Sequence, residues 1–289
     1  MAFVPPHFSK FGSSADDLIK KKLEDDGKHS LIVNAQSKNI KATHTINTVK
    51  KGEGSTLEAK LALKYEDKQW GESTLELATS GKVSQDVRLT KLAPNTTVTT
   101  RFDTDSKFGS FGASPAFQYR QEFFAGSLEY NYAKKNAIVG LVGGYEGFSV
   151  GAQVTANTTK LMGEKKDEAL TCNFGLQYED RNVTAAAGVD SENSVNLSLF
   201  HNMNKDTQLA GKVIVTVNNS SSVVGAVQHV LSPNTLLKGK VHIVNDYQYA
   251  IAGHVQQKLA SPDLTLGVTA FIDSKKPAPV FGISATFDA

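Results

Sequence analysis

The sequence predicts an all-β fold: a transmembrane antiparallel β-barrel of about 19 strands, preceded by one amphipathic helix near the N-terminus. Three observations predict it. From residue 30 onward, apolar and polar side chains alternate with a period of two. The alternating segments are mostly about ten residues long, whereas strands of globular proteins average about five or six. Their apolar faces have almost no charge, as a surface in contact with hydrocarbon requires.

Composition and charge exclude other classes of protein. The chain has 289 residues, of which 40% are hydrophobic and 21% are charged, and its net charge is +2. A disordered chain has fewer apolar residues, and a dedicated nucleic-acid-binding domain is strongly basic, so we expect no nucleic-acid partner. The longest apolar run covers residues 137–145, far shorter than the roughly 20 residues of a membrane-spanning helix. The single cysteine excludes a disulfide framework.

Residues 7–23 form the one segment with a clear helical period. Pro5 and Pro6 precede it, and proline is tolerated at the start of a helix. Gly12 predicts a bend, after which Ser13 or Ser14 caps a second helical segment. The apolar stripe consists of Phe8, Phe11, Ala15, Leu18, Ile19 and Leu23. We therefore expect a helical segment and linker over residues 1–26 and a transmembrane β-barrel over residues 27–289.

The segment 55–65 shows the strand pattern most clearly, because Leu57 and Leu61 fall on one face while Glu58 and Lys60 fall on the other. Clusters of Gly, Pro, Asn and Asp separate such segments. The predicted strands are 30–37, 40–49, 55–65, 72–79, 82–91, 95–103, 113–121, 123–132, 136–144, 147–156, 169–178, 181–190, 193–201, 206–217, 222–231, 234–244, 246–257, 263–272 and 279–288.

Strand length favours a membrane barrel over a soluble sandwich. About ten residues at about 3.3 Å per residue, tilted by about 40°, span roughly 25 Å, the height of the lipid-facing band of such a barrel. About nineteen strands enclose a cylinder roughly 35–40 Å across, which is too wide for side chains to fill. The sequence therefore predicts a water-filled pore.

The polar face of the predicted barrel has more bases than acids. A wall of this sign raises the local concentration of anions, so we expect mild anion selectivity that includes phosphate-bearing metabolites. The candidate pore-lining residues are Lys10, Lys20, Lys21, Lys41, Lys60, Lys64, Arg88, Arg101, Arg120, Lys212, Lys238 and Lys240. The helix lies either flat on the membrane surface or on the inner wall, where apolar Val142, Ala186, Phe200 and Val224 would receive it.

No pattern of catalytic or metal-binding residues stands out. Residues 147–151 match the G-x-S-x-G motif of α/β-hydrolases, but that motif needs a helix after its turn, and here another strand follows. The seven histidines show no metal-ligand spacing. We therefore expect no enzymatic activity, no catalytic residue, no cofactor and no metal.

Several stretches resemble the eukaryotic mitochondrial porins, the voltage-dependent anion channel family. They are Pro5-Pro6 followed by Gly12 and the run Ala15-Asp16-Asp17-Leu18, the turn Gly143-Gly144-Tyr145-Glu146-Gly147-Phe148, and the closing stretch from Gln228-His229 through Ser232-Pro233-Asn234 to Lys240-Val241. The resemblance covers essentially the whole chain, and the conjunction of these motifs is more specific than any one of them.

This resemblance implies a barrel whose first and last strands are parallel and whose N-terminal helix lies inside the pore. It implies a voltage-gated, weakly anion-selective diffusion channel of the mitochondrial outer membrane, which passes ATP, ADP, phosphate and other small metabolites. The candidate gating helix then includes Phe8, Phe11, Gly12, Ala15, Asp17 and Leu18. Expected partners are membrane lipids, with nucleotides and small anions as permeants; homo-oligomers and cytosolic kinases docking at the rim are further options.

Two alternatives stay open. A related mitochondrial barrel translocates precursor proteins, although the basic polar face and short N-terminal segment argue against that function. The other alternative is a soluble lipid-binding or structural β protein, which would stay monodisperse without detergent. The first residues show no charged stretch followed by an apolar one, so we expect no secretory signal, and any organelle address is internal.

Overall fold

The computed structural model describes residues 3–20, 29–51, 54–104, 111–162, 169–191, 193–217, 220–245, 248–259, 263–275 and 278–288. The helical elements are η1 (Phe8–Lys10), α1 (Ser13–Lys20) and α2 (Thr158–Leu161). The strands are β1 (Ser30–Ser37), β2 (Ile40–Lys51), β3 (Gly54–Asp67), β4 (Gly71–Ala78), β5 (Val83–Leu89), β6 (Thr96–Thr104), β7 (Phe111–Gln121), β8 (Phe124–Asn131), β9 (Asn136–Tyr145), β10 (Phe148–Asn157), β11 (Leu170–Glu179), β12 (Val183–Val189), β13 (Ser194–Asn202), β14 (Thr207–Thr216), β15 (Ser220–Ser232), β16 (Thr235–Val244), β17 (Gln248–Leu259), β18 (Leu264–Asp273) and β19 (Val280–Asp288).

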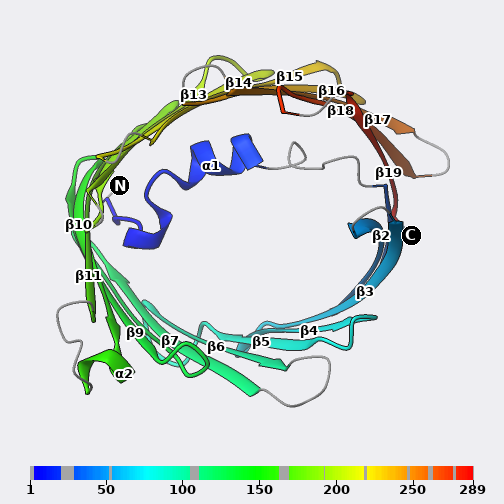
Figure 1. The fold of residues 1–289 in the computed structure, drawn as a ribbon. Helices are drawn as coiled ribbons and strands as arrows, with labels where there is room; N and C mark the ends of the chain where they lie inside the picture. The colour runs from blue at the N-terminus through cyan, green and yellow to red at the C-terminus, as the bar shows by residue number, and fades with distance from the viewer. Residues whose placement is uncertain are drawn as a thin grey trace. The chain divides into compact units, whose positions relative to one another are not determined.

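All the strands belong to one 19-stranded sheet, in which each strand pairs with its neighbours in the chain (Figure 1). The first and last strands also pair with each other. This β1–β19 pairing is parallel, with Ser30 opposite Ser284 and Asn34 opposite Asp288, and it closes the sheet into a barrel. The predicted fold class is therefore confirmed, including the parallel closure that the family resemblance implied.

Short turns connect most neighbouring strands, as antiparallel pairing allows. The turn between β9 and β10 consists of Glu146 and Gly147, whose φ angles are 48° and 89°. Two successive residues with positive φ are what a two-residue hairpin turn matched to the strand twist requires. The glycine-rich stretch before this turn is therefore part of a hairpin rather than a nucleotide-binding loop.

The predicted strands correspond one to one with the observed strands, and their ends differ by at most two residues. The predicted helical segment over residues 7–23 is divided next to Gly12, as the sequence predicts. The structure has the 3₁₀ turn η1 and then α1, separated at Phe11 and Gly12, while residues 21–28 lie outside the described residues. The one-turn helix α2 was not predicted; the Asn157 side chain caps it by accepting a hydrogen bond from the Lys160 N–H.

The chain divides into two compact units. The first consists of Met1–Phe11, Ala35–His44 and Glu58–Leu176, and the second of Gly12–Asn34, Thr45–Leu57 and Gln177–Ala289. The N-terminal segment contributes to both, since η1 belongs to the first unit and α1 to the second. No helix within the described ranges is long and apolar enough to cross a membrane.

Candidate functional site

The strands present one exposed apolar face, and the opposite face is polar or covered. In β13, Leu197 and Leu199 are exposed while Ser194 is buried. In β18, Val268 is 50% exposed and the next residue, Thr269, is 5% exposed. Apolar side chains exposed to water over so large an area are unfavourable, which makes lipid the natural solvent of this face. The opposite face holds the charged residues and the N-terminal segment.

In the first unit, the start of the N-terminal segment packs on β9 and β10, where glycines make room for it. A Cβ at Gly144 would come within 2.9 Å of both the Phe3 ring and Pro5. A Cβ at Gly151 would come within 3.0 Å of the Phe8 ring. Close approach of this kind is a recognised reason for glycine in a strand. The glycines of this wall therefore form the surface on which residues 3–8 dock.

Gly12 is the first residue of the second unit, and it is constrained in two ways. Its φ is +69°, in the left-handed region that glycine adopts without steric cost. A Cβ there would also come within 2.5 Å of the Ser198 Oγ. The Gly12 N–H donates a hydrogen bond to Gln177 Oε1 at 2.9 Å. The predicted bend at Gly12 is therefore fixed by its contacts with Ser198 on β13 and Gln177 on β11.

In the second unit, α1 packs on β13, β14 and β15, on the concave side of these strands (Figure 1). The buried cluster at this contact consists of Ala15, Leu18, Ile19, Ala210, Val224 and Ala226, with Phe200 packed against it. The same helix is tied by an ion pair, because Lys212 Nζ donates to Asp16 Oδ1 at 2.7 Å. The helix therefore packs on the face of the strands opposite the exposed apolar face. This contact favours a position on the inner wall over a position flat on a membrane surface.

Of the four residues predicted to contact the helix, three lie in the second unit with α1, and the fourth lies in the first unit. Val224 and Phe200 contact α1 as predicted, and Ala186 lies 3.7 Å from the position that a Cβ on Gly12 would occupy. Val142 is fully buried, but it belongs to the first unit. The wall that meets α1 is therefore the one formed by β13–β15.

The predicted gating-helix residues lie in different elements and differ in burial. Phe8 lies in η1 with its ring centroid 5.2 Å from that of Phe11, while Ala15 and Leu18 are buried under α1. Asp17 is exposed and makes no ion pair among the described residues. The acid that contacts the wall is its neighbour Asp16, which is not among the predicted gating-helix residues. The available signal was its position at the edge of the apolar stripe.

Four of the predicted pore-lining bases pair with carboxylates on neighbouring strands β3–β6. Lys60 Nζ lies 2.7 Å from Glu76, and Lys64 Nζ lies 2.7 Å from both Glu66 and Glu72. Arg88 pairs with Glu72 at 3.4 Å, and Arg101 pairs with Asp103 at 3.1 Å and with Asp86 at 3.8 Å. These bases and acids nearly balance, so this part of the wall contributes little net charge.

The other predicted bases lie outside that cluster. Lys10, Lys41, Arg120 and Lys240 make no ion pair within the described part of the chain. Lys212 and Lys20 face Asp16, the latter at 4.0 Å with a largely exposed side chain. Lys238 is buried beside His254 on β17, and Lys21 lies outside the described residues. The uncompensated positive charge thus comes from a few dispersed residues.

His7 is buried in the first unit, and its Nδ1 has no hydrogen-bond partner among the described residues. Burial lowers the pKa of His7 below 6.5, and the positive charges of Arg120 and Lys10 lower it further. The docked N-terminal segment therefore favours the neutral imidazole.

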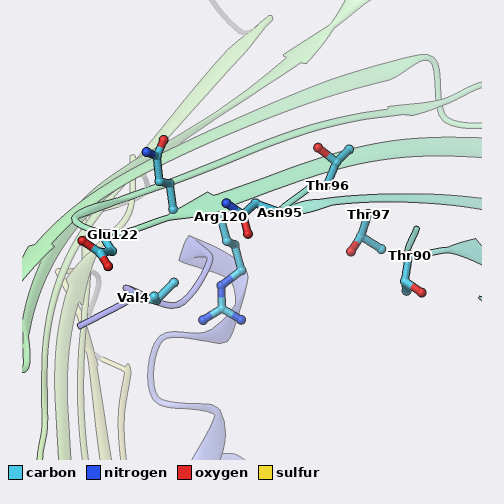
Figure 2. Close-up of a pocket in the computed structure, with 8 residues that line it drawn as sticks. Val4, Thr90, Asn95, Thr96, Thr97, Arg120 and Glu122 are labelled. Atoms are coloured by element: carbon cyan, nitrogen blue, oxygen red, sulfur yellow. The ribbon is translucent and has the colours of Figure 1, made fainter. Parts of the chain in front are cut away.

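A cavity of about 840 Å³ lies in the first unit where β5, β6 and β7 meet the N-terminal segment (Figure 2). Its lining residues are Val4, Thr90, Asn95, Thr96, Thr97, Arg120, Gln121 and Glu122. Figure 2 shows the Arg120 side chain directed into it, next to Val4. Within the described residues, no group of three His, Cys, Asp or Glu side chains is placed to hold a metal ion.

Comparisons with known proteins agree with this architecture. The family model described as eukaryotic porin matches residues 4–282. Among solved structures, a variant of the Rhodopseudomonas blastica porin gives a TM-score of 0.56 at 6% identity, covering 89% of this chain and 98% of that one. A triple mutant of the same porin gives a TM-score of 0.52 at 6% identity, covering 84% and 94%. At this identity the likeness shows the fold alone. A comparison with curated protein sequences gives no match.

Proposed function

The chain belongs to the eukaryotic porin family, and from that premise we propose that it is a voltage-gated, weakly anion-selective channel of the mitochondrial outer membrane. As a eukaryotic porin with a closed barrel, it is a multi-pass membrane protein that forms a diffusion pore. Family and fold are those of channel proteins rather than enzymes. The proposed permeants are ATP, ADP, phosphate and other small metabolites.

One observation supports the channel more than any other: the division of the strands into an exposed apolar face and a polar face. A protein that stays in water would not expose valine, leucine and phenylalanine along strand after strand. A barrel with apolar residues outside and charged residues inside meets lipid on one side and water on the other. Membrane lipids are accordingly its first proposed partner.

Weak anion selectivity follows from the charges that remain after pairing. The β3–β6 cluster is nearly neutral, and the net charge of the whole chain is only +2. Lys10, Lys41, Arg120 and Lys240 make no ion pair within the described ranges, so they contribute a small positive potential. A small potential raises the local concentration of anions without excluding cations.

Voltage gating is proposed to involve the N-terminal segment. Its two parts are held by limited contacts: residues 3–8 rest on glycines, and the eight residues of α1 bury three apolar side chains and form one close ion pair with the wall. A segment with so few buried contacts is one of the first parts of a fold to open. Because it includes charged residues, a membrane potential would bias its position.

Planar-bilayer recording of the purified full-length chain under a potassium chloride gradient tests this proposal. We expect single-channel conductance steps and a reversal potential whose sign indicates a higher permeability to chloride than to potassium. At larger voltages of either sign, we expect states of lower conductance. Clear cation preference would contradict the selectivity, and a lack of conductance steps would contradict the channel itself.

A chain lacking residues 1–20 separates gating from conduction. It should still form an open channel, because the strands and their closure do not include these residues. Its voltage-dependent substates should be lost or blunted. Gating identical to that of the full chain would remove the N-terminal segment from the mechanism.

A further inference from the structure

The short helix that follows β10 leaves two large apolar side chains uncovered. Leu161, the last residue of α2, is 38% exposed, and Met162, which follows it, is 90% exposed. Both lie outside the strands, so they do not belong to the exposed apolar strand face described above. Two adjacent apolar side chains in water favour a partner that covers them.

Hydrogen bonds hold the start of α2 against the neighbouring turn between β8 and β9. The Thr158 N–H and the Thr158 hydroxyl both donate to the Lys135 carbonyl oxygen at 2.8 Å. The Asn157 side-chain amide donates to Asn136 Oδ1 at 3.0 Å. These contacts fix the direction in which α2 leaves β10, so an ordered element presents the apolar pair.

The helix lies on the outer side of the wall formed by β9 and β10, away from the N-terminal segment (Figure 1). The strand residues on this side include Val139 on β9 and Val154 on β10, both apolar and exposed. Lipid is the natural solvent of such a face. The apolar end of α2 therefore continues the lipid-facing surface beyond the end of the strands.

Two tyrosines indicate the level of α2 along the barrel. Tyr130 and Tyr132 lie at the end of β8 with ring centroids 4.6 Å apart, and Tyr132 is exposed. Tyrosine is enriched where lipid meets water, because its ring is apolar and its hydroxyl is polar. The Tyr130 hydroxyl lies 3.4 Å from Thr158 Oγ1, which places the start of α2 at the same level.

Basic side chains surround the apolar pair. Lys134 and Lys135 are exposed in the turn that holds α2, and Lys160 is exposed next to Leu161. At the surface of a bilayer, headgroup phosphates lie beside the first part of the acyl chains. Apolar side chains flanked by lysines match this layer, since both parts of it then have a partner.

We propose that α2 is a lipid anchor: Leu161 and Met162 insert at the lipid–water interface, and the surrounding lysines contact anionic headgroups. The inference rests on the proposed membrane channel and adds to it a lipid contact outside the strands. Because hydrogen bonds join α2 to the turn between β8 and β9, the anchor holds this edge of the first unit at the interface.

Spin labelling of the full chain in vesicles of phosphatidylcholine and phosphatidylglycerol tests the anchor. The labelled variant is Met162→Cys combined with Cys172→Ala, which removes the single native cysteine. A nitroxide among acyl chains collides more often with oxygen than with a water-soluble nickel chelate, whereas a nitroxide in water shows the reverse. We expect residue 162 to give the oxygen-favoured result.

Ser80→Cys in the same Cys172→Ala chain is the matched control. Ser80 is exposed in the turn between β4 and β5. Since neighbouring strands are antiparallel, this turn lies at the same edge of the sheet as α2. Its neighbours include no large apolar side chain in the turn, so a label there should give the water result.

Substitutions around residue 162 separate the apolar contact from the charges. Leu161→Asn in the labelled chain should lower the ratio of inserted to exposed label about tenfold, the effect of losing one buried leucine side chain. Leu161→Met stays apolar and should keep the label inserted. Lys134→Gln combined with Lys135→Gln should reduce insertion in the mixed vesicles and have little effect in phosphatidylcholine alone.

A water-exposed label at residue 162 would overturn the proposal, as would equal results at residues 80 and 162. Spin–spin broadening at residue 162 that disappears when the protein is diluted in lipid would show that a second copy covers α2, which also overturns it. Planar-bilayer conductance tests the channel separately. A conducting channel whose residue 162 stays in water would remove the anchor and leave the proposed function standing.

Discussion

Asp16 and Asp17 are adjacent in sequence, yet the structure uses them differently. Asp16 pairs with Lys212 at 2.7 Å, and both side chains are largely covered, with exposures of 29% and 22%. Asp17 is exposed and makes no ion pair among the described residues. A partly buried pair is screened less by solvent than a surface pair, so its loss should be felt at α1.

We therefore predict that Asp16→Asn weakens docking of α1 by about 1 kcal/mol, whereas Asp17→Asn has almost no effect. Hydrogen exchange of residues 13–20 measures docking, and the closing voltage of the proposed gated channel gives a second readout. Lys212→Gln should have a similar effect, and combining it with Asp16→Asn should cost less than the sum of the two. Equal effects of Asp16→Asn and Asp17→Asn would show that the ion pair does not hold the helix.

Because the pKa of His7 is lowered in the docked segment, we predict that the stability of docking depends on pH. Docking lowers the pKa of the His7 imidazole. The undocked state therefore binds more protons at this side chain once the pH falls through about 6.5. Docking is therefore fully stable above this pH and weakens as the pH falls, by up to about 1.4 kcal/mol per pH unit, until the lowered pKa is passed.

Hydrogen exchange of residues 8–11 at pH 7.5 and at pH 5.5 measures this effect. The wild-type chain should exchange faster at the lower pH after correction for the intrinsic rate. His7→Asn does not titrate in this range, so its corrected rates should be the same at both values. A wild-type chain with equal corrected rates would contradict the prediction.

At the scale of elements, the glycines of β9 and β10 decide whether the N-terminal segment can dock. A Cβ at Gly144 would meet the Phe3 ring, Pro5 and the Phe148 carbonyl oxygen, each at 2.9 Å. The carbonyl belongs to the paired strand and cannot easily move, so the N-terminal segment must shift. Glycine at this position therefore serves the contact between two elements rather than a turn.

We predict that Gly144→Ala weakens docking of residues 3–8 by about 1–3 kcal/mol, as overpacking of a close contact does. Gly253→Ala on β17 is the control, because a Cβ there meets nothing within 4 Å. Limited proteolysis at Lys10 should become faster in Gly144→Ala alone. Equal cleavage in both variants would mean that the glycine surface is not what holds the segment.

Most elements could be predicted from the sequence, because each strand shows its own period of two and needs no knowledge of its partner. Gly12 also predicts the division of the helix, but not the contact with the barrel wall that fixes it. The apolar stripe continues at helical spacing through Phe8, Phe11 and Ala15, but Gly12 adopts a positive φ against Ser198 and ends the first segment. That contact depends on tertiary structure, which a local pattern does not encode.

At the scale of the whole molecule, alternation places the charged side chains on one face but does not say which of them meet. The register of β3 with β4 puts Ala62 opposite Glu76, which brings Lys60 diagonally next to that acid. Such diagonal pairs lie within reach of long side chains. The sequence therefore predicted an excess of bases on the wall, but the neutrality of the β3–β6 cluster became visible only with the register.

This distinction between paired and unpaired bases predicts how substitutions change selectivity. Lys60→Gln combined with Glu76→Gln removes one base and one acid that already compensate each other at 2.7 Å. The net charge of the wall stays the same, so the reversal potential under a salt gradient should not move. Lys41→Gln combined with Lys240→Gln removes two bases that make no ion pair among the described residues, so the proposed anion preference should fall.

The same recordings at low and high ionic strength test whether the net charge of the wall causes the selectivity. A selectivity that arises from net wall charge is screened by salt, with a Debye length of about 30 Å at 0.01 M and about 3 Å at 1 M. The difference between the two double variants should therefore be largest in dilute salt and nearly vanish in concentrated salt. If the neutral Lys60 and Glu76 removal shifts the reversal potential as much as the loss of Lys41 and Lys240, selectivity arises at the ion-paired cluster and not from the dispersed bases.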